Sequence, residues 1–309
     1  MRCLSQGIFQ EIFRTPIRRI GAFAGCALLA ASCSNTGGTS PTGPSGPPPA
    51  GSTIVYTAVG ASDATGYGSS VVCVPFVVDC PNGTGYVQVA VRALQSQGYK
   101  VTVRNMGEPT AVIGQDFQSL GQQYGRIIAF NFIDREMPFV LTNSTLVTIF
   151  AGGNDVNVIT AALGGGAGGN DPLGFIDAQI RAFGADYTTL LSGIRNLAPS
   201  ARVIVLNVPN MAGLPYMAGD SLQKRQAAQR AAVGMTTQVV NPLIGQGATI
   251  VDLMCDGRSY VPSNYSSDGM HPNDAGYAFM ASELLRAITS SSYPSPQTSC
   301  GPMTVVPNP

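Results

Sequence analysis

The chain has 309 residues, of which 44% are hydrophobic and only 11% are charged. This length and composition allow one large domain, or two smaller ones, with a sizeable core, and they argue against a disordered chain. The formal net charge is zero, and no block rich in Lys and Arg follows the first twenty residues. The positive patch that nucleic-acid binding requires is therefore missing, so we expect no nucleic-acid partner.

Residues 1–32 have the features of an export signal. A basic cluster at residues 14–19 precedes an apolar run at residues 20–31, which is too short to cross a bilayer and is typical of a signal peptide. Small residues then lead into Cys33. This stretch resembles a bacterial lipoprotein signal, which implies that Cys33 is lipidated and becomes the new N-terminus; plain secretion and a retained anchor are the alternatives. We therefore expect a protein of the cell envelope, in the periplasm or on the outer membrane, or a secreted protein, with a lipid anchor as its only contact with a membrane.

Residues 33–52 are rich in Gly, Ser, Pro and Thr, a composition that leaves little to bury, and we predict a linker there. The folded domain is expected to cover residues 53–309, where short apolar runs alternate with segments of helical periodicity. Strands are predicted at residues 53–59, 99–104, 146–150, 202–207 and 249–253. Helices are predicted at residues 86–97, 111–124, 175–197, 221–240 and 274–288, the last with Asn273 or Asp274 as its N-cap.

This alternation predicts a parallel five-stranded sheet with helices on both faces, and in such sheets ligands bind beyond the carboxyl ends of the strands. Four connecting segments are expected to line the pocket, at residues 67–83, 126–143, 155–174 and 208–217. Residues 126–140 alternatively form a further strand. Residues 164–169 match Gly-x-Gly-x-x-Gly, but they follow no predicted strand and open no βαβ unit, so we interpret them as a flexible loop rather than a dinucleotide site.

The domain holds four cysteines, an even number that favours disulfides in an oxidising compartment. Of the three possible connectivities, we favour Cys73 with Cys80, which closes a short loop, and Cys255 with Cys300, which ties down the C-terminal tail. Buried free thiols are the alternative. The chain has a single histidine, so the cysteines form no zinc-binding pattern, and we expect neither a metal ion nor a cofactor.

Polar motifs lie where the carboxyl edge of the predicted sheet would be. Ser62 follows the first strand, Gly107 the second and Asn154 the third, whereas Asp268 and His271 precede the last helix. Imidazole is the side chain best suited to transfer protons near neutral pH, and a carboxylate three residues earlier can orient its ring. Ser62 then has a base for attack on a carbonyl carbon. The backbone N–H groups of Ser62 and Gly107 and the side-chain amide of Asn154 are candidate donors to the resulting oxyanion.

In these residues the chain resembles the SGNH, or GDSL-type, hydrolase family. The matching stretches occur in the family's order and are Gly60-Ala61-Ser62-Asp63, Asn105-Met106-Gly107, Gly152-Gly153-Asn154-Asp155 and Asp268-Gly269-Met270-His271-Pro272-Asn273. They span residues 54 to about 289, and the chain departs from the family at Ala61, where Asp is usual. The resemblance implies a three-layer α/β/α fold with a flavodoxin-like sheet. It also implies a metal-independent serine esterase or lipase that cleaves carboxylic esters through an acyl-enzyme, with Ser62, Gly107, Asn154 and His271 as the family's signature residues.

Each motif also has a purely structural interpretation, as a tight turn or a loop glycine. Asp252, at the end of a predicted strand, is a second candidate for the acid that orients His271. Residues 60–64 nearly match Gly-x-Ser-x-Gly, which raises an α/β-hydrolase alternative, although an acid only three residues before the histidine argues against it. The functional alternatives are a glycan O-deacetylase or acyltransferase of the same fold and a non-catalytic envelope protein that binds a glycan or lipid. The expected partner is therefore a small-molecule, lipid or glycan ester.

Overall fold

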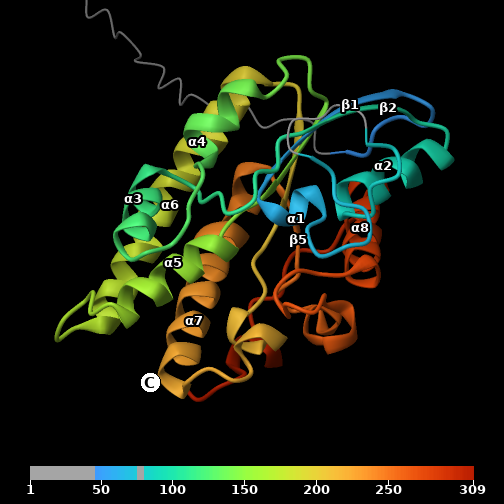
Figure 1. Ribbon diagram of the computed structural model, residues 1–309. Coiled ribbons are helices and arrows are strands. Elements are labelled where there is room, and N and C mark those ends of the chain that lie inside the picture. Colours follow the sequence, from blue (N-terminus) through green and yellow to red (C-terminus); the bar gives the residue numbers. More distant parts are fainter. Residues whose placement is uncertain (1–45, 75–79) are drawn as a thin grey trace, which may run out of the picture. The chain divides into compact units, whose positions relative to one another are not determined.

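Figure 1 shows the computed structural model, which describes residues 46–74 and 80–309. The predicted signal peptide, Cys33 and most of the predicted linker lie outside the described residues, so their roles stay predictions. Among the described residues, no helix is long and apolar enough to cross a membrane.

Five strands form a single parallel sheet. They are β1 (Thr53–Gly60), β2 (Lys100–Asn105), β3 (Leu146–Phe150), β4 (Arg202–Leu206) and β5 (Thr249–Val251). Their order across the sheet is β2-β1-β3-β4-β5, and every neighbouring pair is parallel. This is the flavodoxin-like order, so the predicted fold class is confirmed. All five carboxyl ends lie on one edge of the sheet, and the connections that leave this edge carry the candidate site.

Two helical layers cover the sheet (Figure 1). On one face, α2 (Tyr86–Ser96) and α8 (Asp274–Thr289) pack against each other, and the other face carries α3 (Gln115–Gln123), α5 (Gly153–Gly164), α6 (Pro172–Leu197) and α7 (Leu222–Gly234). Because successive side chains of a strand point to opposite faces, β1 places Tyr56 and Ala58 in the core with α2 and α8, and Val59 in the core with the other layer. Both faces of the central strands β1, β3 and β4 are buried, which explains their apolar runs, whereas the edge strand β2 is partly exposed.

The connecting segments contain short helices and tight turns. The short helices are α1 (Ser62–Thr65) and α4 (Phe132–Arg135), and the 3-10 turns are Met137–Phe139, Met211–Gly213, Pro215–Met217, Asn241–Gln246, Gly257–Tyr260, Pro262–Asn264 and Gly301–Thr304. The helix predicted at residues 221–240 is α-helical only as far as Gly234, because it continues into a π-helical turn, Met235–Val240.

Residues 126–140 form no strand, contrary to one of the two interpretations of this segment. They hold α4, where the side chain of Asn131 caps the helix by accepting the N–H of Asp134 at 2.9 Å. Two of the apolar side chains that suggested a strand pack on the sheet face that carries α3, α5, α6 and α7. Phe132 joins that core and Met137 lies against Gly193 of α6, whereas Phe139 is exposed. The apolar composition therefore reflects packing against a helical layer rather than strand pairing.

The segment at residues 155–174 was expected to be a pocket-lining loop and is instead largely helical. Val156, Val158 and Ile159 of α5 are completely buried, together with Ala162. A helix that is buried on several sides lacks the amphipathic stripe by which helices are recognised in a sequence, so α5 escaped prediction. The helix predicted from residue 111 begins only at Gln115, because residues 112 and 130–132 exchange backbone hydrogen bonds instead.

Two disulfides join Cys73 to Cys80 and Cys255 to Cys300, the pairing that the sequence favours. The second bridge holds the C-terminal tail against the segment after β5. The tail is also held by the side chain of Gln229 on α7, whose Oε1 accepts the N–H groups of Val305 and Val306 at 2.8 and 3.0 Å.

We expect the two disulfides to differ in their contribution to stability, because a cross-link that closes a longer loop removes more entropy from the unfolded chain. The cysteines of the pairs lie 45 and 7 positions apart. Replacing both Cys255 and Cys300 with Ser should lower the free energy of unfolding by about 3 to 4 kcal/mol, and replacing both Cys73 and Cys80 by about 2 to 3 kcal/mol. Urea unfolding of the two double variants measures the difference, and an equal or reversed order would contradict the loop-length argument.

Candidate active site

Ser62 lies at the first turn after β1, where the chain leaves the carboxyl edge of the sheet and enters α1. The Ser62 carbonyl fixes this turn by accepting the Thr65 hydroxyl at 2.7 Å and the Tyr67 N–H at 3.0 Å. Gly66 ends the helix with φ of +79°, a left-handed conformation that glycine adopts without strain. Only 5% of Ser62 is exposed, so neighbouring groups hold its side chain in place.

The structure brings the hydroxyl of Ser62 to 2.9 Å from Nε2 of His271, although the two residues are 209 positions apart. On the other side of the ring, Nδ1 lies 2.6 Å from Oδ2 of Asp268. Because Nδ1 donates to the carboxylate, Nε2 is left as the acceptor for the serine hydroxyl. Three residues singled out in the sequence therefore form one continuous line of hydrogen bonds.

The other carboxylate oxygen of Asp268 is also saturated with donors. Oδ1 accepts the N–H groups of Met270 and His271 at 2.8 and 2.9 Å and the hydroxyl of Ser266 at 2.9 Å. Partial burial would by itself raise the pKa of this carboxyl, but the hydrogen bonds from His271, Met270 and Ser266 outweigh it and lower the pKa to about 2. Asp268 is therefore ionised at neutral pH, as a partner for a positively charged imidazolium must be.

The loop that carries the candidate base is closed by its own backbone. The Ser266 N–H donates to the carbonyl of His271 at 2.8 Å, and Gly269 between them adopts φ of +70°. The Gly269 carbonyl accepts the Tyr216 N–H at 3.0 Å, which fixes the loop to the segment after β4. Asn273, one of the two residues predicted as the N-cap of the last helix, then caps α8. The imidazole is thus presented by a short loop that is anchored at both ends.

Tyr67 contacts the candidate base and was not singled out in the sequence. Its ring packs edge-on against that of His271, with 4.6 Å between the ring centroids, and its carbonyl accepts the Tyr277 hydroxyl at 2.7 Å. The only sequence signal for Tyr67 is its position five residues after Ser62. The contact restricts rotation of the imidazole on the side that Asp268 does not control.

Gly107 lies directly beside α1. A Cβ atom at this position would come within 2.7 Å of the Ala64 Cβ and 2.9 Å of the Ala61 carbonyl oxygen, so only glycine fits. The Gly107 N–H donates to Oδ1 of Asn105 at 3.0 Å, and the Asn105 amide donates in turn to the Ala64 carbonyl. Gly107 therefore lies next to the Ser62 turn, but its N–H is already engaged.

Asn154 and Asp155 open α5 and fasten it to the loop after β2. The amide of Asn154 donates one hydrogen to the Ala111 carbonyl at 2.9 Å, which leaves its second hydrogen for another acceptor. The carboxyl of Asp155 accepts the Ile113 N–H at 3.0 Å. Burial raises the pKa of Asp155 to about 7 even though the bond from Ile113 opposes the shift.

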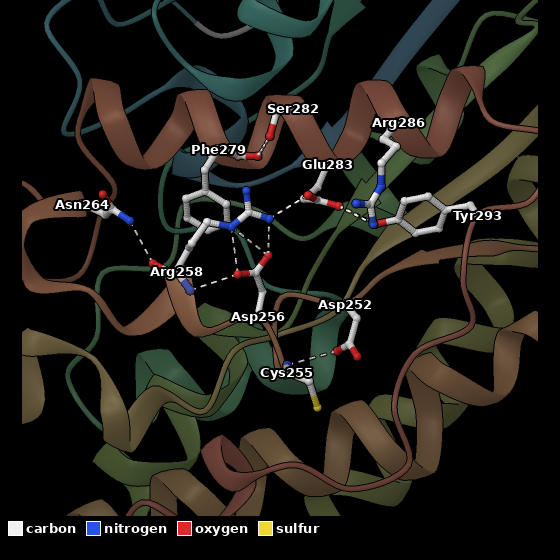
Figure 2. Close-up of polar contacts among 10 residues, drawn as sticks. All are labelled: Asp252, Cys255, Asp256, Arg258, Asn264, Phe279, Ser282, Glu283, Arg286 and Tyr293. Carbon is white, nitrogen blue, oxygen red and sulfur yellow. Dashed lines mark hydrogen bonds and ion pairs between the residues drawn. The ribbon is translucent and has the colours of Figure 1, made fainter.

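Asp252, the second candidate for the orienting acid, contacts other groups. Its Oδ1 accepts the side-chain amide of Asn207 at 2.9 Å and the N–H of Cys255 at 3.2 Å, and its Oδ2 accepts the Gln297 N–H at 2.9 Å. Figure 2 shows this carboxylate directed toward Cys255, on the segment that follows β5. Asp252 thus organises the disulfide-linked region, and Asp268 is the acid that contacts the imidazole.

Arg258 connects the segment before the histidine loop to α8 (Figure 2). Its guanidinium lies 2.6 Å from a carboxylate oxygen of Asp256 and 2.6 Å from one of Glu283, and it also lies over the ring of Phe279 at 5.1 Å. The Arg258 side chain is 47% exposed, so each pair contributes modestly to stability. Its effect is geometric, because it fixes how the chain enters the loop that carries His271.

A small apolar cavity of about 40 Å³ lies at the carboxyl ends of the strands. Its lining includes the chain neighbours of the candidate site residues, namely Asp63, Gly153, Met270 and Pro272. A larger hollow of about 610 Å³ is bounded by α5, α6 and α7, and no candidate site residue lines it. Within the described ranges, no cluster of His, Cys, Asp or Glu has the arrangement of a metal site.

The fold and this site define a class of protein, the parallel α/β proteins with a serine after the first strand. Residues 58–279 match the model of the GDSL-like Lipase/Acylhydrolase family, which covers more than half of the chain. The protein therefore belongs to the GDSL-like lipase/acylhydrolase family, as the sequence resemblance implied, and ester hydrolysis is the activity class of that family.

One solved structure agrees with the fold, and two further ones are similar to the chain. A lipase from a goat rumen metagenome has 18% sequence identity and a TM-score of 0.51, with 76% of this chain and 97% of the lipase covered. An extracellular lipase from Streptomyces rimosus has 18% identity and a TM-score of 0.48, with 77% and 100% covered. An acetyl xylan esterase from Geobacillus stearothermophilus has 16% identity and a TM-score of 0.48, with 76% and 94% covered. No curated protein matches the sequence.

We expect Asp155 to make stability depend on pH. Its pKa of about 7 in the folded protein lies above the ordinary value of 3.8, so the folded state binds this proton more tightly than the unfolded state. The contribution of the protonated Asp155 carboxyl to the free energy of unfolding is complete below about pH 4, and it is lost as the pH rises through 7. Asp155→Asn should remove up to about 4 kcal/mol of this pH dependence, at 1.36 kcal/mol per pKa unit. Urea unfolding between pH 4 and 8 tests this, and parallel curves for both proteins would contradict it.

Proposed function

We propose that this protein is a serine esterase that hydrolyses carboxylic esters through an acyl-enzyme. The observation that carries the proposal is the line of contacts from Ser62 through His271 to Asp268 at the carboxyl edge of the sheet. Membership of the GDSL-like lipase/acylhydrolase family supports ester hydrolysis as the class of reaction. The roles of the three side chains follow from their chemistry.

In the first half of the reaction, Nε2 of His271 takes the proton of the Ser62 hydroxyl as Oγ attacks the ester carbonyl carbon. The imidazolium that forms is stabilised by Asp268, which is ionised because its pKa is held at about 2. When the tetrahedral intermediate collapses, the alcohol leaves with the proton from Nε2, and the acyl group stays on Oγ. A water molecule then attacks with His271 again acting as base, and the carboxylic acid is released.

The tetrahedral oxyanion needs donors between the Ser62 turn and the start of α5. The Ser62 N–H and the second hydrogen of the Asn154 amide are suited to this role, because the first Asn154 hydrogen is used to hold the side chain against Ala111. The Gly107 N–H becomes a third donor once it exchanges the Asn105 side chain for the oxyanion. The hydrogen bond from the Gly107 N–H to the substrate oxygen would then form only as the transition state is reached. A donor that binds the transition state more strongly than the substrate accelerates the reaction.

We also propose that the protein is exported. The disulfides Cys73–Cys80 and Cys255–Cys300 are of a kind that persists in oxidising compartments, and they agree with the signal predicted for residues 1–32. The substrates would then be lipid, glycan or small-molecule esters outside the cytoplasm, in reach of a protein that is secreted or anchored through Cys33.

Ser62→Ala and His271→Ala should each lower kcat for p-nitrophenyl acetate by on the order of 10⁴-fold or more, because both residues act as one unit. The wild-type serine should also react with a fluorophosphonate, whereas Ser62→Ala should not. A non-catalytic binding protein predicts the opposite, namely no labelling of the wild type. Unchanged hydrolysis by both purified variants would sink the proposal.

Asn154→Ala should lower kcat by about 10²- to 10³-fold if the amide donates to the oxyanion, with KM changed far less. Thr160→Ala is a matched control, because this residue lies on the same helix and its hydroxyl donates to the Asn157 carbonyl at 3.0 Å, inside α5. Steady-state kinetics of both variants make the comparison. If the two losses were equal, Asn154 would have no special role in the reaction.

A further inference from the structure

Glu136 is a completely buried carboxyl group that the proposed reaction does not use. It lies between α4 and the turn Met137–Phe139, and its side chain is 0% exposed. Its Oε2 accepts the backbone N–H of Gly60 at 2.9 Å, at the last residue of β1 and two positions before Ser62. A buried acid bonded to the end of the strand that carries the candidate nucleophile calls for an explanation.

The hydrogen-bond ladder between β1 and β2 explains why the Gly60 N–H needs a partner. The Ala58 carbonyl accepts the Met106 N–H at 2.8 Å, and the Gly60 carbonyl accepts the Glu108 N–H at 3.1 Å. In a regular parallel ladder, the Gly60 N–H between these two bonds would donate to the carbonyl of Met106. Here it donates to Glu136 instead, so the side chain replaces one rung of the ladder.

The hydrogen bond that is missing, from the Gly60 N–H to the Met106 carbonyl, lies where the chain after β2 turns toward the candidate site. Gly107, the next residue, packs against Ala61 and Ala64 and is a proposed oxyanion donor. If the Gly60 N–H were to pair with the Met106 carbonyl, the peptide between residues 106 and 107 would rotate into the sheet. Glu136 removes that competing pairing by satisfying Gly60 itself.

We propose that Glu136 is a positioning residue. By accepting the Gly60 N–H, it keeps the peptide between residues 106 and 107 out of the β1–β2 ladder, in the orientation from which the Gly107 N–H can turn from Asn105 to the oxyanion. This inference rests on the proposed function, and Glu136 acts through Gly60 rather than by touching the substrate. Met106 is completely buried, so solvent cannot replace the Gly60 N–H as the hydrogen-bond partner of the Met106 carbonyl.

The surroundings of this carboxyl group favour its neutral form. Burial raises the pKa of Glu136 well above its ordinary value, the bond from Gly60 opposes the shift, and the nearby carboxylate of Glu108 adds to it. The groups around it are Glu108, the adjacent Arg135 and the phenol of Tyr86, which is also fully buried. Among the described residues, neither Oε1 of Glu136 nor the Tyr86 hydroxyl has a hydrogen-bond partner. A neutral amide of the same shape can therefore replace the acid.

Three variants test this role by their kcat and KM values. Glu136→Gln keeps an acceptor for Gly60 and should retain kcat close to that of the wild type. Glu136→Met keeps the shape without the acceptor and should lower kcat by about 10- to 100-fold with KM nearly unchanged, since a displacement of about 1 Å at a site can cost 10²-fold. Glu136→Asp keeps the acid but withdraws it by one methylene, and it should fall between the two; it also serves if the Met variant does not fold.

The matched control is Thr57→Val, on the same strand. It removes a buried hydrogen bond to Ser144 at 2.8 Å without touching the end of β1. It should be destabilised in urea by an amount similar to Glu136→Met, yet keep kcat. Equal losses of kcat in Glu136→Gln and Glu136→Met, or a loss in Glu136→Met no larger than in Thr57→Val, would overturn the inference.

Ser62→Ala measured beside these variants separates the two proposals. If Ser62→Ala abolishes hydrolysis while Glu136→Met behaves like Thr57→Val, only the role of Glu136 fails. If Ser62→Ala remains active, the proposed function itself fails. Amide exchange of the peptide that contains Gly60 gives a readout without substrate, and it should be faster in Glu136→Met than in Glu136→Gln.

Discussion

The parallel register of the five strands is the constraint on which the rest of the structure depends. Each connection must return along a helix to start the next strand at the same edge, so all carboxyl ends meet at one side of the sheet. Residues that are far apart in the chain are thereby placed within contact distance, and the bond between Ser62 and His271 is the product of this geometry. The site consequently inherits its rigidity from a sheet whose central strands are buried on both faces.

The edge of the sheet places the parts of the site, and local hydrogen bonds then orient them. Asp268 is held by three donors from its own loop, so the acid and the base move as one unit with that loop. The loop after β2 is fastened to α5 through Asn154 and Asp155. Asp268, His271 and Asn154 are therefore each held by protein groups independently of any substrate, as pre-organised catalysis requires.

The strands and the outer helices were predictable because burial on two faces, or on one stripe, leaves a periodic signal in the sequence. Ser62, Asp268 and His271 were recognisable because their motifs are local and occur in order. Helix α5 and residues 126–140 were not, because their patterns reflect tertiary packing. Glu136 carries no local signal, because its role depends on a hydrogen bond that is missing between β1 and β2. Tyr67 has only its position after Ser62 as a signal, and the ring that it contacts, His271, is 204 positions away.

The point where the chain enters the domain bears on how the site meets its substrate. Residues 46–52 run along the amino ends of the strands, where Arg202 donates to the Gly46 carbonyl and the Lys100 N–H donates to the Ser52 carbonyl. Ser62 lies at the opposite edge, after the carboxyl end of β1. Residues 46–52 therefore leave the carboxyl edge uncovered.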